Sequence, residues 1–80
     1  MPRTSSSLPP TGAVLRQLRL EKELTQEELA RRAGLAMTYI SLVETGKRNP
    51  TVAAVARILA VLGVTWTEFG ARVDTALEAS

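Results

Sequence analysis

The chain has neither cysteine nor histidine among its 80 residues. A disulfide, a zinc-finger site and an imidazole general base are therefore all excluded. No apolar run approaches the roughly 18 residues of a membrane-spanning helix, and Arg3 is followed by no apolar segment of the kind found in secretory signals. We expect a cytoplasmic protein that is not an enzyme and has no metal, cofactor, small-molecule ligand or membrane partner.

Aromatic residues are scarce, at 4% of the chain, whereas hydrophobic residues make up 45%. A core of Ala, Leu and Val favours helices over a sheet, and no strand pattern, internal repeat or second domain is evident. A domain of this size buries only about 60% of its unfolded surface, so it would gain stability from a partner. The sequence predicts an all-α domain over residues 12–80, preceded by a Pro/Ser-rich disordered tail over residues 1–11.

Charge is unevenly distributed, although the net charge is only +2. Residues 1–50 carry eight Lys or Arg against five Glu, whereas residues 51–80 carry two Arg against three Asp or Glu. A basic N-terminal half fits a polyanion partner facing that half. Ordinary scatter of charges over a solvated surface explains the imbalance equally well, so charge alone does not identify the partner.

Start and stop signals predict five helices, which span about residues 12–22, 26–33, 37–45, 52–62 and 66 onwards. The start of the second is well marked. Thr25 is a favourable N-cap, Glu28 completes a capping box, and Leu24 and Leu29 occupy the hydrophobic-staple positions around it. Together these signals define where the second helix begins.

Residues 25–46 have the spacing of two short helices joined by a tight turn. Ala30 is small enough for the second helix to cross close to the first, and Gly34 suits the left-handed conformation that ends a helix. Ile40 and Val43 are three residues apart and share one face, so they pin the second helix onto the first. This pattern predicts a helix-turn-helix unit whose second helix lies in the major groove of DNA.

The C-terminal helix has the same start signals as the second, with Thr65 as N-cap and Glu68 as its capping-box partner. Gly70 inside it costs roughly 1 kcal/mol relative to Ala, which a close helix contact or fraying beyond it would explain. The apolar stripe of this helix either covers the monomer's own core or forms a homodimer interface. We favour the interface, composed of Val64, Trp66, Phe69, Val73 and Leu77.

The strings LTQEELA, ISLVETGKRNP and LGV resemble the phage-repressor-like helix-turn-helix domains of the Cro or xenobiotic-response-element type. The resemblance covers about residues 13–70 and implies a compact five-helix, lambda-repressor-like domain that binds a pseudo-palindromic operator as a homodimer. The small size, the TYIS string and the fifth helix are most similar to controller proteins of restriction–modification systems. Two alternatives stay open: an antitoxin, and a protein-interaction module that retains the fold.

The resemblance also implies which residues meet double-stranded DNA. Gln26, at the positive end of the second helix, would contact a phosphate. The first turns of the third helix would approach base edges, and the loop after it would meet the DNA backbone or the minor groove. The implied DNA-binding residues are Gln26, Met37, Thr38, Tyr39, Ser41, Leu42, Lys47, Arg48 and Asn49.

Met37 and Leu42 depart from the family pattern, in which Gln, Arg, Lys or Asn often occupies these positions. Neither side chain hydrogen-bonds a base edge, although both are able to touch a thymine methyl group. Direct readout then falls to Thr38, Tyr39, Ser41 and Arg48, with a further contribution from DNA shape.

A structural ion pair is implied between Arg19 and Glu44. In the repressors that the chain resembles, an Arg on the first helix and a Glu near the end of the recognition helix form a partly buried pair. Both positions match here, and such a pair would hold the third helix to the first. The alternative is that Arg19 and Glu44 are unrelated surface charges.

Overall fold

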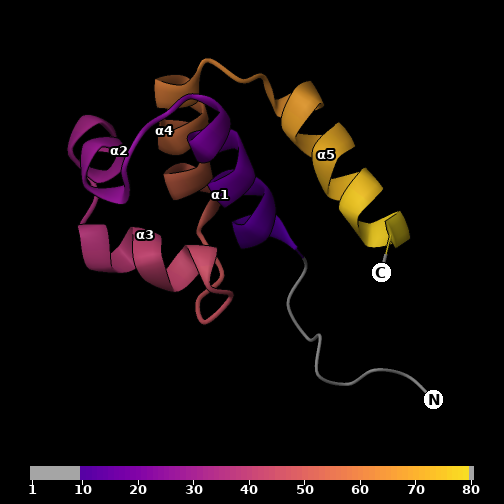
Figure 1. The fold of residues 1–80 in the computed structure, drawn as a ribbon, viewed down its shortest axis with the longest axis horizontal. Coiled ribbons are helices and arrows are strands. Elements are labelled where there is room, and N and C mark those ends of the chain that lie inside the picture. Colours follow the sequence, from indigo (N-terminus) through magenta and orange to yellow (C-terminus); the bar gives the residue numbers. More distant parts are fainter. Residues whose placement is uncertain (1–9, 80) are drawn as a thin grey trace.

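The computed structural model describes residues 10–79, and every regular element within them is a helix. The elements are α1 (Thr11–Glu21), α2 (Gln26–Ala33), α3 (Met37–Glu44), α4 (Val52–Leu62) and α5 (Trp66–Ala79). α1 packs against α3, α4 and α5, and α2 packs against α3 and α4. α5 therefore lies on the far side of α1 from α2 and α3 (Figure 1). The predicted five-helix, all-α fold is confirmed, with the helix ends within one residue of prediction.

The predicted disordered tail lies outside the described residues except for Pro10 and Thr11. Thr11 is already the first residue of α1, one residue before the predicted start of that helix. Among the described residues no single helix is long and apolar enough to cross a membrane. α4 and α5 meet that test of length and composition only as a pair, with a bend of 107° between them.

One hydrophobic core joins the helices. Ile40 and Val43 are almost fully buried, as their shared face predicts, and Ala30 is buried on α2, which packs against α3. Burial of a Leu, Ile or Val side chain contributes about 1.5–3 kcal/mol. The other buried members of the core are Val14, Leu15, Leu18, Leu29, Ala33, Val55, Ile58, Leu59, Leu62 and Phe69.

Two reciprocal capping boxes start α2 and α5. The Glu28 backbone N–H donates to Thr25 Oγ1 at 3.0 Å, and the Thr25 backbone N–H donates to Glu28 Oε1 at 2.8 Å. Thr65 and Glu68 form the same two bonds at 3.0 and 2.9 Å. The backbone N–H of each threonine lowers the pKa of its glutamate below 4.5. The boxes therefore stabilise the fold above the unfolded-state pKa, and that contribution is lost as the pH falls through the lowered value.

The turn after α1 contains a non-glycine residue in the left-handed region, Glu23, with φ of 60°. This conformation costs an L residue about 1–2 kcal/mol, which glycine avoids because it has no Cβ. Glycine also loses more backbone entropy on folding, so the net gain in stability is smaller than that cost. We expect Glu23→Gly to raise the melting temperature by about 3–6 °C in thermal denaturation followed by circular dichroism. Glu27→Gly is the control, because it puts glycine inside α2 and should lower the melting temperature. An unchanged or lower value for Glu23→Gly would contradict the strain.

Candidate nucleic-acid interface

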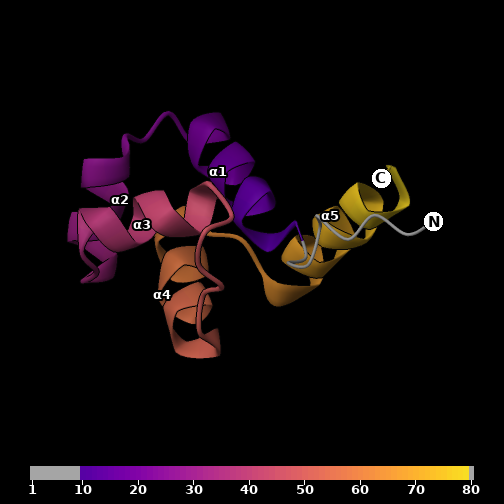
Figure 2. The same cartoon turned by 90° about the horizontal axis from the view of Figure 1, so that it is seen from below.

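α3 forms an edge of the domain, below α2 in Figure 1 and in front of α2 in Figure 2. Its inner face carries Ile40 and Val43, which are buried in the core. Met37 and Thr38 in its first turn are exposed, whereas Ser41 and Leu42 are partly buried. The N-cap residue Ala36 makes no side-chain hydrogen bond to the first turn. The first turn of α3 is therefore the most accessible part of the predicted recognition surface.

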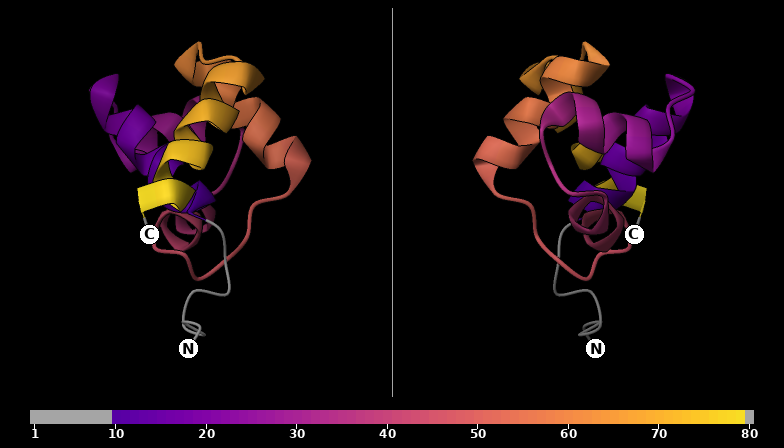
Figure 3. Two further views of the ribbon diagram at one scale, coloured as in Figure 1. Left: turned by 90° about the vertical axis from the view of Figure 1, so that its right-hand side faces the viewer. Right: turned by 90° about the vertical axis from the view of Figure 1, so that its left-hand side faces the viewer.

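Tyr39 organises the loop between α3 and α4, seen beside the end-on view of α3 in the right panel of Figure 3. Its hydroxyl accepts a hydrogen bond from the Thr51 backbone N–H at 3.2 Å. The Arg48 guanidinium lies over its ring, 5.5 Å from the centroid, at a distance typical of a cation–π contact. A tyrosine hydroxyl that accepts one bond still has its own proton to donate. Tyr39 therefore holds the Arg48 guanidinium over its ring and keeps its hydroxyl proton for a further hydrogen bond.

The loop backbone is tied to the end of α3. The N–H groups of Lys47 and Arg48 both donate to the Leu42 carbonyl, at 2.9 and 3.2 Å. Lys47, Arg48 and Asn49 have exposed side chains. Two positive charges and an amide thus follow the C-terminal end of α3, and Arg48 reaches back over Tyr39 in the first half of the helix.

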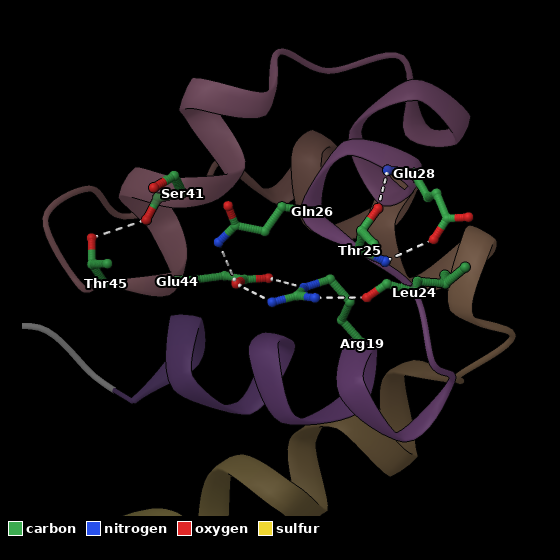
Figure 4. Close-up of polar contacts among 8 residues, drawn as sticks. All are labelled: Arg19, Leu24, Thr25, Gln26, Glu28, Ser41, Glu44 and Thr45. Atoms are coloured by element: carbon green, nitrogen blue, oxygen red, sulfur yellow. Dashed lines mark hydrogen bonds and ion pairs between the residues drawn. The ribbon is translucent and has the colours of Figure 1, made fainter.

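Arg19 and Glu44 form a bidentate ion pair between α1 and α3 (Figure 4). Arg19 Nε donates to Glu44 Oε2 at 2.8 Å, and Arg19 Nη2 donates to Oε1 at 2.9 Å. The side chains are only 8% and 2% exposed, respectively. Arg19 Nη1 also donates to the Leu24 carbonyl at 2.6 Å. Arg19 therefore holds both the end of α3 and the turn that leads into α2.

Gln26, the predicted phosphate contact, has a partner inside the protein. Its Nε2 donates to Glu44 Oε1 at 3.0 Å, which adds α2 to the Arg19–Glu44 pair (Figure 4). An amide NH₂ has two donors, so one remains after this bond. The three side chains connect α1, α2 and α3 and set where the partly buried Gln26 lies at the start of α2.

α1 and α3 also meet at a second point, which sequence reasoning missed. A Cβ added to Gly12 would lie 2.8 Å from the Val43 carbonyl carbon, 3.4 Å from Glu44 Cα and still closer to the Val43 oxygen. Only glycine lets the first turn of α1 approach the last turn of α3 this closely. The available signal was a glycine in the first turn of a helix, where alanine has the higher helix propensity.

α5 meets the domain along one edge. Phe69 is 7% exposed and belongs to the monomer's core, so it leaves little surface for the predicted dimer interface. Val64 and Val73 are partly buried and pack against the same core. Trp66 and Leu77 are 51% and 50% exposed. The predicted interface therefore depends chiefly on Trp66 and Leu77, because they alone of the five keep about half of their surface accessible.

Glu21 on α1 and Arg72 on α5 form a second bidentate pair, which sequence reasoning also missed. Its two hydrogen bonds measure 2.8 and 2.9 Å, and both side chains are exposed. The hydrogen bonds, assisted by coulombic attraction, lower the pKa of Glu21 and raise that of Arg72. The pair joins α5 to the C-terminal end of α1. No local pattern marks it, because the two residues are 51 positions apart.

α2 and α3 are two short helices joined by a tight turn, and the buried Arg19–Glu44 pair holds the inner side of α3 while its first turn stays accessible. This is the arrangement of a helix-turn-helix DNA-binding domain. A helix-turn-helix family model matches residues 15–69. The chain therefore belongs to the helix-turn-helix family, and it is a DNA-binding transcription regulator of the controller-protein type.

Two relatives illustrate the similarity. An uncharacterised helix-turn-helix-type transcriptional regulator, y4dJ of Sinorhizobium fredii, is 44% identical over 57 residues, which cover 71% of this chain and 74% of the relative. The control protein C.MunI of a Mycoplasma species is 43% identical over 58 residues, which cover 71% and 78%.

A solved structure extends the similarity to nearly the whole domain. The restriction–modification controller protein C.Esp1396I, as a tetramer in complex with its natural 35-base-pair operator, superposes with a TM-score of 0.78 at 34% identity. The match covers 84% of this chain and 88% of that one.

Proposed function

We propose that the protein binds a pseudo-palindromic operator as a homodimer in the cytoplasm and regulates transcription, including that of its own gene, as the controller of a restriction–modification system. The observation that carries this proposal is the buried network of Arg19, Glu44 and Gln26. These hydrogen bonds hold the inner side of α3 against α1 and α2, while the first turn of α3 stays accessible. The operator complex of C.Esp1396I supports the same use of the fold.

In this proposal the network also places Gln26 for a phosphate. One of the two hydrogens on Gln26 Nε2 is donated to Glu44. The other hydrogen, together with the backbone N–H groups at the start of α2, would be donated to a phosphate oxygen. Phosphate contacts of this kind set the register of the protein on the duplex. The remaining DNA-contacting set is Met37, Thr38, Tyr39, Ser41, Leu42, Lys47, Arg48 and Asn49.

Homodimerisation would place two copies of α3 about one DNA turn, roughly 34 Å, apart. The exposed Trp66 and Leu77, with the edges of Val64 and Val73, supply the apolar surface for it. C.Esp1396I binds its operator as a tetramer, which supports self-association of the fold.

The proposal is tested by fluorescence anisotropy with DNA from immediately upstream of the gene. Because DNA binding releases counterions, we expect affinity to fall about 10³-fold or more between roughly 50 and 200 mM salt. Lys47→Gln should reduce the slope of log affinity against log salt concentration by about one, because one phosphate contact is lost. Arg32→Gln is the matched control, an exposed cation in the last turn of α2. Equal affinity for upstream and unrelated DNA, or none for either, would exclude a sequence-specific regulator.

A further inference from the structure

α3 lacks the side chains that best distinguish one base pair from another. None of its eight residues, MTYISLVE, is an Arg, Lys, Asn or Gln, the types that make bidentate hydrogen bonds to base edges. Glu44, its charged residue, is held in the buried pair with Arg19. Thr38 and Ser41 remain, but a hydroxyl both donates and accepts, so it pairs with either kind of base. Hydrogen bonds from α3 therefore discriminate weakly between base pairs.

Met37 is the large apolar side chain that α3 exposes to solvent. It is the first residue of the helix and is 50% exposed. Leu42 and Tyr39 are partly buried, and the Tyr39 ring is covered by the Arg48 guanidinium. Ala36, directly before the helix, is exposed and adds a methyl group to the same end. In a helix-turn-helix domain the N-terminal residues of the recognition helix meet the base edges, and here that end is apolar.

We propose that Met37 contacts the C5-methyl group of a pyrimidine in each half of the operator and so selects a methylated pyrimidine there, an inference that rests on the DNA binding of the proposed function. Among the groups that base edges present in the major groove, the thymine methyl is the apolar one. Met37 buries its exposed surface against this methyl, and its unbranched thioether side chain adapts to the position of the group. 5-Methylcytosine carries the same methyl at the same ring position, so it is a second source of the contact. Cytosine and uracil lack the methyl group and are not selected.

A double-mutant cycle between Met37 and the methyl groups of the DNA tests this contact. Fluorescence anisotropy compares DNA from immediately upstream of the gene with the same DNA in which deoxyuridine replaces thymidine, a change that removes the methyl groups and keeps the base pairing. Burial of a group of this size changes affinity about fourfold, and two half-sites together give about fifteenfold. We expect this loss for the wild type and for Met37→Leu, which keeps an apolar side chain. Met37→Ala should bind thymidine-containing DNA more weakly and lose most of the difference between the two DNAs.

Leu20→Ala is the matched control for Met37→Ala. Leu20 lies on α1, is 48% exposed and stands outside the predicted DNA-contacting set. This variant should keep the affinity of the wild type and its full loss on deoxyuridine. A second arm replaces cytosine with 5-methylcytosine in the same DNA. Tighter binding that is present in the wild type and absent in Met37→Ala would assign the contact to a methylated cytosine.

The outcomes separate this inference from the proposed function. A wild type that binds upstream DNA no better than unrelated DNA overturns both. If the wild type binds upstream DNA specifically, but both base replacements change its affinity no more than that of Met37→Ala, the regulator stands and the Met37 contact is overturned. A loss on deoxyuridine that depends on Met37 supports contact with a thymine methyl group.

Discussion

Replacing Glu44 with glutamine is expected to lower the free energy of unfolding by about 3–5 kcal/mol. The substitution leaves the charged Arg19 guanidinium in a site where its side chain is 8% exposed, facing an amide in place of a carboxylate. Arg19 loses the charge-assisted partner of both Nε and Nη2, and the buried positive charge is no longer compensated. Urea denaturation followed by circular dichroism measures the change.

Glu21→Gln provides the control for this first prediction. It removes the carboxylate of the other bidentate pair, Glu21–Arg72, but both of those side chains are exposed to water. Solvent already compensates such charges, so we expect little change in stability. If Glu44→Gln lowered stability as little as Glu21→Gln, the buried Arg19–Glu44 pair would not be what holds α3 to α1.

Replacing Gly12 with alanine is expected to cost about 2–3 kcal/mol. The new Cβ would overlap the backbone carbonyl of Val43 and lie 3.4 Å from Glu44 Cα, and backbone atoms move only if the helices separate. α1 and the last turn of α3 must then move apart, which also strains the Arg19–Glu44 pair nearby. Thermal denaturation measures the loss, and operator affinity measured well below the melting temperature should fall with it.

Gly70→Ala is the matched control for Gly12→Ala. Both substitutions add one methyl group to a helical glycine, Gly12 in the first turn of α1 and Gly70 inside α5. Position 12 adjoins the backbone of α3, whereas a Cβ added at position 70 would meet no other element within 4 Å among residues 10–79. With the protein monomeric, Gly12→Ala should therefore lower the melting temperature and Gly70→Ala should raise it. A higher melting temperature for both would show that α1 and α3 separate at little cost.

The helices and the turn of the helix-turn-helix were predictable because their signals are local. Thr25 and Glu28 form a capping box within three residues, and Gly34 has the left-handed conformation, with φ of 72°, that ends α2. The spacing of Ile40 and Val43 predicted the buried side of α3 because a helix repeats every 3.6 residues. Each of these signals acts within about one helical turn, so the chain carries it whatever else it packs against.

The candidate site was less predictable because its residues meet across long separations. The resemblance to known repressors, and not periodicity, pointed to Arg19 and Glu44, which are 25 residues apart. Gln26 was predicted for a phosphate, and the structure adds its bond to Glu44, 18 residues away. Phe69 shares its apolar stripe with Trp66, yet only the packing of α5 on α1 shows that Phe69 enters the core while Trp66 stays half exposed.

The sequence by itself determined the five helices, the helix-turn-helix spacing and the family, since capping, turn chemistry and helical periodicity act between residues a few positions apart. Only the tertiary structure decided that Gly12 lies against α3, that Arg19 binds Leu24 as well as Glu44, and that Gly70 contacts no other element of the described chain. The physical reason is that each of these depends on how closely whole helices approach. That distance is set by the summed packing of the core, and no local pattern encodes it.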